Sequence, residues 1–332
     1  MAAVFTFIST FLKSQLASVP APTASYDGKT VIVTGATGGL GLEASRYFTR
    51  LGAARLILAV RDTERGEAVR KEILASVPDA TTTIEVWPLD LASFESTRAF
   101  GHRALKELDR LDVLLANAGV MSLGKAKMAE GYELQITVNL ISTALYILML
   151  LPLLKRTAVE KNVETVVTLA SSLAHYSTLF PQQSAPHILN SFKPGTALYE
   201  RYSTSKLLSL LFIQELGARL TQANPNNPVI VNGCHPGVCK SNLFQGLPPL
   251  VRVLFGAFNQ LIGRSNDEGA RALMQAVEAG KETHGKYVDA GKVAETSAFV
   301  RSEKGKEVQK KVWDELMEVL EGIEPGVSKN VA

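Results

Sequence analysis

Seven short apolar segments, each followed by a segment of helical periodicity, constrain the fold of this chain more than any other feature. Several are nearly continuous runs of Val, Ile, Leu and Ala, a pattern typical of strands buried on both faces of a parallel sheet. The expected strands are residues 30–34, 55–60, 82–87, 113–116, 165–170, 229–233 and 285–288. The expected helices are residues 40–51, 63–77, 93–107, 132–154, 199–220 and 267–279. This alternation predicts an α/β fold with a doubly wound parallel sheet of about seven strands.

No repeat or linker divides the central part of the chain, so we expect residues 27–303 to form one domain of the Rossmann type. Residues 1–26 are expected to form an N-terminal amphipathic helix or extension, and residues 304–332 a C-terminal helix and tail. Two irregular stretches near 173–198 and 241–263 interrupt the alternation and are expected to be substrate loops. The first could instead be a surface insertion.

Composition excludes several functions. The 332 residues carry a net charge of only +3 and no basic run of five or more, which argues against a nucleic-acid partner. Cys234 and Cys239 match no common zinc pattern and are expected to be reduced thiols, typical of a cytoplasmic protein. The histidines are scattered without ligand spacing, so no metal is expected.

Two apolar segments could be mistaken for membrane spans. Residues 4–16 are too short to cross a bilayer. With Phe5, Ile8, Phe11, Leu12 and Leu16 along one side, they would form either a docking helix or a weak interfacial anchor at a membrane surface. Residues 140–154 are expected to be a buried core helix. Its outer face could pair with a second copy in a homo-oligomer, or the terminal helices could cover it.

A glycine-rich loop follows the first expected strand and opens a helix, at Thr34-Gly35-Ala36-Thr37-Gly38-Gly39-Leu40-Gly41. Glycines there permit a tight turn and let the backbone approach a pyrophosphate at the helix N-terminus. Taken alone, the loop is equally consistent with an ordinary turn between a strand and a helix.

Tyr202 and Lys206 lie one helical turn apart, so the ammonium can reach the neighbourhood of the phenol and favour its anion. Bringing a phenol from its reference pKa near 10 to neutral pH requires a shift of ~3 units, or about 4 kcal/mol. An exposed ion pair supplies only ~0–1 kcal/mol. The pair must therefore lie in a cleft of low effective dielectric, beside a cationic nicotinamide ring.

Together with five ordered motifs, this pair resembles the classical short-chain dehydrogenase/reductase family over about residues 29–288. The runs 59–62 and 235–238 and the stretch around Asn139 are most similar to its retinol-dehydrogenase-like branch and the fungal relatives of that branch. The resemblance implies that Asn139, Ser172, Tyr202 and Lys206 are catalytic. It also implies a cofactor site made of Gly35, Thr37, Gly39, Leu40, Gly41, Arg61, Asp90, Leu91, Asn117, Ala118, Gly119, Pro236, Gly237 and Val238, with Tyr202 and Lys206.

The implied roles agree with the chemistry of these side chains. Tyr202 would give or take the proton at the substrate oxygen, Ser172 would hydrogen-bond that oxygen, and Lys206 would hold the cofactor ribose. Asn139 would hold a water that continues the relay. Ser171 adjoins Ser172, and since consecutive strand residues point in opposite directions, only one of them can face the substrate. The family uses the second serine.

Arg61 ends the second strand, where an acidic residue would favour a ribose diol and an arginine can bind a 2′-phosphate. We therefore expect NADP(H) as cofactor. Asp62, next in sequence, is expected to cap the following helix.

The sequence thus predicts an NADP(H)-dependent oxidoreductase that interconverts an alcohol and a ketone or aldehyde on a fairly apolar small molecule. The fungal relatives of the family often serve in secondary-metabolite pathways. The main alternative is an NADP(H)-binding sensor or partner subunit without turnover. A third hypothesis, an epimerase or dehydratase, normally requires a larger C-terminal domain than the 96 residues after Pro236, since 332 − 236 = 96.

Overall fold

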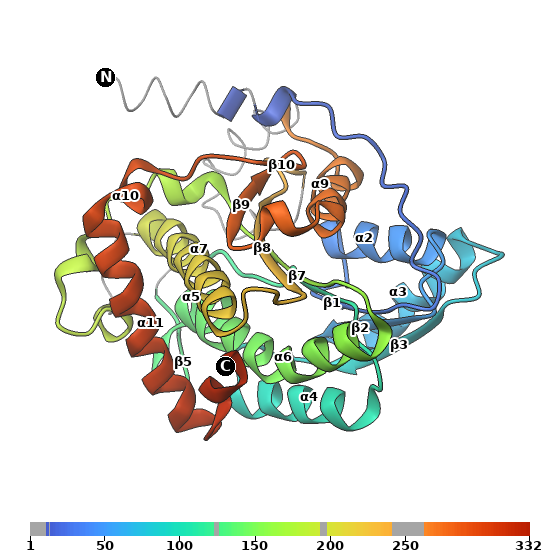
Figure 1. Cartoon of the computed structure of the whole chain (residues 1–332). Coiled ribbons are helices and arrows are strands. Elements are labelled where there is room, and N and C mark those ends of the chain that lie inside the picture. The colour runs from blue at the N-terminus through green and yellow to red at the C-terminus, as the bar shows by residue number, and fades with distance from the viewer. Residues whose placement is uncertain (1–10, 13, 123–125, 193–197, 241–261) are drawn as a thin grey trace.

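An eight-stranded sheet forms the centre of the molecule (Figure 1), a computed structural model that describes residues 11–12, 14–122, 126–192, 198–240 and 262–332. Its strand order is β10-β9-β8-β7-β4-β1-β2-β3. All neighbours pair in parallel except β10, which runs antiparallel to β9. The strands are β1 Thr30–Thr34, β2 Arg55–Val60, β3 Thr83–Pro88, β4 Val113–Ala116, β7 Thr165–Ala170, β8 Val229–His235, β9 Lys286–Asp289 and β10 Lys292–Val293.

Helices cover both faces of the sheet, so the predicted doubly wound, single-domain α/β fold is confirmed. One face carries α2 Gly39–Arg50, α3 Thr63–Ser76 and α9 Asn266–Glu278 (Figure 1). The other carries α4 Phe94–Glu107, α5 Leu134–Ile136, α6 Ser142–Lys161 and α7 Leu198–Ala223, with α10 Ala298–Arg301 and α11 Glu303–Ile323 outside them. Each face has its own hydrophobic core. The short hairpin β5 Met128–Ala129 and β6 Tyr132–Glu133 lies outside the main sheet.

Side-chain caps fix several helix starts where the sequence predicted them. Asp62 accepts a hydrogen bond from Arg65 N at 2.9 Å and caps α3, as expected. Ser93 accepts one from Ser96 N at 3.2 Å and caps α4. Such caps satisfy N–H groups that have no partner inside the helix.

The expected helix 132–154 differs from the structure at both ends. Its first two residues form β6, and a π-helical turn, Thr137–Ile141, separates α5 from α6. Pro152 does not end the helix, which continues to Lys161. A proline cannot donate to the carbonyl four residues before it. Here Asn330 Nδ2 donates to that carbonyl, Leu148 O, at 3.1 Å.

The segment Leu134–Lys161 is long and apolar enough to cross a membrane, yet 94% of its most hydrophobic window is buried inside the fold. A core helix passes the same test, and the burial confirms the expectation for residues 140–154.

The C-terminal helix α11 covers the outer side of α7. Its buried face includes Val308, Val312 and Leu316, and the Trp313 ring stacks on Phe212 with centroids 5.9 Å apart. The final 3₁₀ helix, Val327–Val331, packs on α6. Of the two alternatives for this face, the structure shows coverage by the chain's own C-terminus.

The N-terminal segment docks by its polar side. Ser14 and Gln15 are buried, and Ser14 Oγ donates to Asp289 Oδ1 at 2.8 Å. Leu12 and Leu16 are 44% and 76% exposed, so docking through these leucines was a wrong expectation. The polar side faces inward because partners for its hydrogen bonds lie there. Residues 5 and 8 of the predicted apolar side lie outside the described residues.

The Leu148 carbonyl gives a direct test of the α6 argument. We expect Asn330→Ala to lower the free energy of unfolding by about 1–3 kcal/mol, because a buried acceptor loses its partner. The cost should be smaller in a Pro152→Ala background, where the new N–H can donate to Leu148 O. Urea denaturation of the four proteins measures this coupling. Equal costs in both backgrounds would contradict the argument.

Candidate active site

The candidate residues gather where the parallel strands end. The C-terminal ends of β1, β4, β7 and β8 meet at one edge of the sheet, and the loops that follow carry the glycine loop, Asn117 to Gly119, Ser172 and Pro236. Ligands of open α/β sheets bind in the crevice at this edge, where the strand order reverses. The reversal here lies between β1 and β4.

Ser172, Tyr202 and Lys206 come together at this edge. The Ser172 side chain lies close enough to the Tyr202 phenol to lower its pKa. Lys206 Nζ lies 6.0 Å from the centroid of the Tyr202 ring and donates to Ala170 O at 2.7 Å. An ammonium has three donors. Within the described part of the chain Lys206 uses one of them in this bond, which leaves donors for a ligand.

The geometry separates Ser172 from Ser171. Ser172 has extended backbone angles and stands at the start of a 3₁₀ turn, Leu173–Tyr176. Ser171 is buried on the opposite side, where its N–H donates to Cys234 O at 2.7 Å. Its side chain lies against Gly233, whose Cβ, if present, would be 3.6 Å from Ser171 Cβ. Ser172 is thus the serine that meets Tyr202.

Burial acts on both titratable groups of this pair. Desolvation raises the pKa of Tyr202 to about 12, although the nearby Ser172 side chain acts in the opposite direction. Desolvation also lowers the pKa of Lys206 to about 8. In the protein alone, therefore, the phenol is protonated at neutral pH. Lys206 alone therefore does not lower the pKa of Tyr202 to neutral pH. The sequence argument assigned the additional positive charge to a nicotinamide ring.

Asn139 holds the segment that follows β4. Its Oδ1 accepts from Val120 N at 2.8 Å, and its Nδ2 donates to Val120 O and to Ser205 Oγ, both at 2.9 Å. The π-helical turn that contains Asn139 has its own support, because Ser209 Oγ donates to Asn139 O at 2.8 Å. Such turns are frequent at functional sites. A Cβ on Gly119 would lie 3.2 Å from Asn139 Oδ1 and 3.5 Å from Lys206 Nζ, so glycine keeps this gap clear.

The glycine loop forms a cradle that side chains would close. Gly35 has a φ of +70°, and a Cβ there would lie 2.9 Å from Ala118 Cα. A Cβ on Gly41 would lie 2.5 Å from Gly35 O and 2.6 Å from Asn117 Nδ2. Asn117 Nδ2 also donates to Thr34 O at 3.0 Å and ties β4 to the loop. These contacts fit the close backbone approach that a dinucleotide requires at a helix N-terminus.

The remaining loop and adenine-side candidates occupy the same edge. Thr37, Gly39 and Leu40 are half-buried at the start of α2. Arg61 is exposed at the end of β2. Asp90 Oδ1 accepts from Ala92 N at 2.9 Å and shapes the turn after β3, while Leu91 is buried. Arg61 is therefore the candidate that extends into solvent.

Sequence reasoning missed the residues that support the turn Pro236-Gly237-Val238. Arg264 is buried and donates to Pro236 O at 3.1 Å and to Ala17 O at 3.3 Å. Gln15 accepts from Val238 N and donates to Val238 O, both at 2.9 Å. Isolated polar residues far apart in sequence gave no signal. The N-terminal segment is thus joined to the expected nicotinamide-side turn.

The first expected substrate loop is described through residue 192. It forms three 3₁₀ turns, Leu173–Tyr176, Pro181–Ser184 and Leu189–Ser191, and buries Phe180 against Phe299 with ring centroids 5.8 Å apart. Residues 193–197 and 241–261 of the two expected loops lie outside the described residues. The described part is packed rather than projecting.

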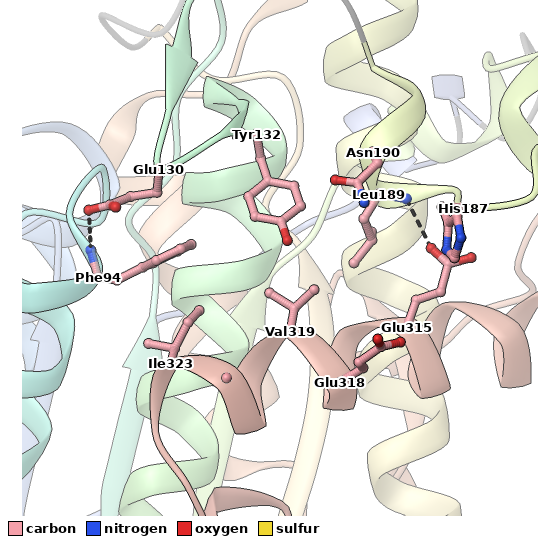
Figure 2. A pocket seen from close by; sticks show the side chains of 11 residues that line it. Phe94, Glu130, Tyr132, His187, Leu189, Asn190, Glu315, Glu318, Val319 and Ile323 are labelled. Carbon is pink, nitrogen blue, oxygen red and sulfur yellow. Dashed lines mark hydrogen bonds between the residues drawn. The ribbon is translucent and has the colours of Figure 1, made fainter.

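A cavity of about 470 Å³ lies between this loop and α11 (Figure 2). Phe94 and Tyr132 line one side, and Val319 and Ile323 of α11 line the other. Two of its three glutamates already serve the fold: Glu315 accepts from Ile188 N and Leu189 N, and Glu130 accepts from Phe94 N. No predicted site residue lines this cavity, so it is separate from the candidate active site.

Known proteins are similar to this chain in sequence and in fold. The family model for short chain dehydrogenases matches residues 29–183. The chain is 38% identical over 329 residues to the short chain dehydrogenase/reductase dmxR8 of a Cryptosporiopsis species, covering 96% of this chain and 99% of that protein. It is 42% identical over 243 residues to the short chain dehydrogenase sol3 of Alternaria solani, covering 72% and 82%.

Solved structures show the same fold. An uncharacterised Mycobacterium paratuberculosis protein superposes with a TM-score of 0.67 at 26% identity, covering 91% of this chain and 98% of that chain. The Pseudomonas aeruginosa protein RhlG, solved with NADP, superposes with a TM-score of 0.59 at 24% identity, covering 80% and 97%. The fold therefore defines a Rossmann-type protein. With relatives that match almost its whole length, the chain belongs to the short-chain dehydrogenase/reductase family, a family of oxidoreductases.

The glycine cradle predicts different outcomes at two neighbouring glycines. A Cβ on Gly38 meets no atom within 4 Å, and its φ of 173° suits any residue. Gly38→Ala should keep the melting temperature but weaken NADPH binding, because the side chain would enter the space facing the loop. Gly41→Ala should lower the melting temperature as well, because its Cβ would clash with backbone. Thermal melts and NADPH fluorescence titration measure both effects. Unchanged NADPH affinity in Gly38→Ala would place the dinucleotide elsewhere.

Proposed function

We propose that the protein is an NADP(H)-dependent oxidoreductase that interconverts an alcohol and a ketone or aldehyde on a fairly apolar small molecule. The observation that carries the proposal is the gathering of Ser172, Tyr202 and Lys206 at one place, with Lys206 Nζ 6.0 Å from the centroid of the Tyr202 ring, beside the glycine cradle. A protein that only senses the nucleotide has no need of a proton donor placed in this way.

In carbonyl reduction, Tyr202 acts as the acid and Ser172 donates a hydrogen bond to the same carbonyl oxygen. The bound nicotinamide supplies the hydride. The raised pKa of Tyr202 keeps its proton in place until negative charge develops on the substrate oxygen. The Lys206 ammonium then stabilises the phenolate that forms.

Lys206 and Asn139 complete the proposed proton path. The donors that Lys206 retains after its bond to Ala170 O would hold the cofactor ribose. Both N–H groups of the Asn139 amide are used by the protein, so a relay water would be held through the free lone pair of Oδ1, in the gap that Gly119 leaves. Reprotonation of Tyr202 would follow this path.

The choice of NADP(H) rests on Arg61. Related folds have been solved with NADP and, in a Brucella melitensis reductase, with NADH, so the fold does not decide the cofactor. Asp62 is engaged in capping α3, and this leaves Arg61 as the side chain suited to a 2′-phosphate.

We assign the substrate to the class of apolar fungal secondary metabolites, since fungal short chain dehydrogenases match most of the chain. The protein is proposed to be cytoplasmic. The exposed Leu12 and Leu16 support weak association with a membrane surface.

Tyr202→Phe should lower kcat for NADPH-dependent reduction of apolar ketones by at least ~100-fold, because positioned acids contribute about 10²–10⁴. Ser172→Ala should show a large loss as well. Ser171→Ala is the matched control and should retain turnover, because its side chain faces away from Tyr202. Absorbance at the nicotinamide band measures the rates. Full activity of Tyr202→Phe would refute the mechanism, and NADPH binding by wild type with no turnover across a broad panel would favour the sensor.

Arg61→Ala should weaken NADPH binding by ~10- to 100-fold and leave NADH affinity nearly unchanged, because a bond to a charged group is worth about 1.5–3 kcal/mol. Fluorescence titration with both nucleotides gives the two affinities. The exposed Arg65, in the first turn of α3, supplies a matched control in Arg65→Ala. An equal loss for NADH and NADPH would mean that Arg61 does not contact the 2′-phosphate.

A further inference from the structure

A fully buried ion pair adjoins the proposed catalytic tyrosine. Arg201 and Glu133 are each 1% exposed, and Arg201 Nε lies 3.5 Å from Glu133 Oε1. Arg201 directly precedes Tyr202 on α7, whereas Glu133 lies in β6, outside the main sheet. Burying two charges costs free energy that their attraction often fails to recover, so such a pair is weak evidence for a stabilising role. Its position suggests another role.

Glu133 is connected to the helix that carries Asn139. Its Oε2 accepts from Gln135 N at 2.7 Å and from Ile136 N at 3.2 Å, and so caps α5. Its Oε1, the oxygen nearest Arg201, also accepts from Gln135 Nε2 at 3.2 Å. One carboxylate thus joins Arg201 of α7 to the first turn of the helix that leads to Asn139.

Gln135 holds the segment that follows β4, residues 120–122, in the same way as Asn139. Gln135 Oε1 accepts from Ser122 N at 3.2 Å, and its Nε2 donates to Ser122 O at 3.3 Å. Asn139 makes the equivalent pair of bonds to Val120. Residues four apart on one helical face therefore hold residues two apart on an extended segment, as a neighbouring β-strand would. This segment follows Gly119 directly.

The first turn of α7 is held on a second side by the preceding residue. Glu200 accepts from Thr178 Oγ1 at 2.7 Å and from Leu179 N at 3.3 Å, both in the loop after Ser172. Neighbouring helix residues point about 100° apart. Glu200 and Arg201 therefore hold the turn before Tyr202 on two sides, Glu200 against the loop after Ser172 and Arg201 against Glu133 of β6.

We infer that Arg201, Glu133 and Gln135 form a positioning network that keeps the Tyr202 phenol in register with the segment 120–122. This inference rests on the proposed function, because it assigns Tyr202 the proton transfer. Arg201 and Glu133 touch neither substrate nor cofactor, and they act through the backbone of α7 and through Gln135. The two charges thus serve to position Tyr202, and we expect loss of the Arg201–Glu133 pair to lower kcat.

The test compares a neutral pair with its single variants. Arg201→Met removes the guanidinium that faces the buried Glu133 carboxylate and should lower the melting temperature. In the double variant Glu133→Gln/Arg201→Met that carboxylate is replaced by a neutral amide, which can still cap α5, so part of the loss in melting temperature should be recovered. We expect its kcat to stay ~10- to 100-fold below wild type with NADPH affinity unchanged, since small misplacements have effects of this size. Arg201→Lys keeps the charge and should restore most of kcat.

Hydrogen exchange gives a readout that does not depend on turnover. The Val120 and Ser122 amides, which donate to Asn139 and Gln135, should exchange faster in the double variant than in wild type. Arg219→Met is the matched control, because Arg219 lies on the same helix, pairs with Glu215 and has a side chain that is 38% exposed. It should change neither kcat nor exchange. Wild-type kcat and exchange in the double variant would overturn the inference. A wild-type protein without turnover would sink the proposed function, while the exchange result would still decide the inference.

Discussion

The burial of α6 from Ser142 to Leu151 is the constraint on which the rest of the structure depends. Every residue of this stretch is buried, so each of its sides is covered: by the sheet, by α4 and by the C-terminal 3₁₀ helix. Gly101 of α4 permits close approach, because a Cβ there would lie 2.6 Å from Met149 Cε. The same helix begins in the π-helical turn that presents Asn139. The packing of α6 in the core therefore also determines where Asn139 lies in the site.

The strands could be predicted because buried parallel strands are short runs of β-branched and aliphatic residues, and five of the seven begin at the predicted residue. The errors have physical causes. Pro152 indicates a helix end by local rules, and only the distant Asn330 supplies the donor that lets α6 continue. The apolar pattern of the N-terminal segment predicts docking through its leucines. Instead, Gln15 accepts from Val238 N and Arg264 donates to Ala17 O, and no local pattern encodes these bonds. The short β10 pairs through a hairpin at Ala290 and Gly291, both with positive φ.

The site residues could be predicted from the sequence through a family resemblance, whereas the residues that support them could not. Ser172, Tyr202 and Lys206 occur in recognisable motifs, and the structure brings them together. Glu133, Gln135 and Arg201 have no such signal, because a glutamate beside a helix start or an arginine within a helix is ordinary in a sequence. Their meaning depends on burial and on the contact between Arg201 and Glu133, which are 68 positions apart, since 201 − 133 = 68. Such information is tertiary.

The electrostatics of the site follow from the same burial. Enclosure raises the pKa of Tyr202 and lowers that of Lys206, so each group is driven toward its neutral form. A neutral phenol is the correct state for donating a proton to a carbonyl. In the reverse direction, the phenol must lose its proton, and a ring that carries positive charge next to it would favour that loss in the same low-dielectric space. The pocket that opposes ionisation in the free protein thus strengthens the effect of the cofactor's charge when the cofactor binds. Under the proposed mechanism, proton transfer at Tyr202 would in this way be coupled to the redox state of the nucleotide.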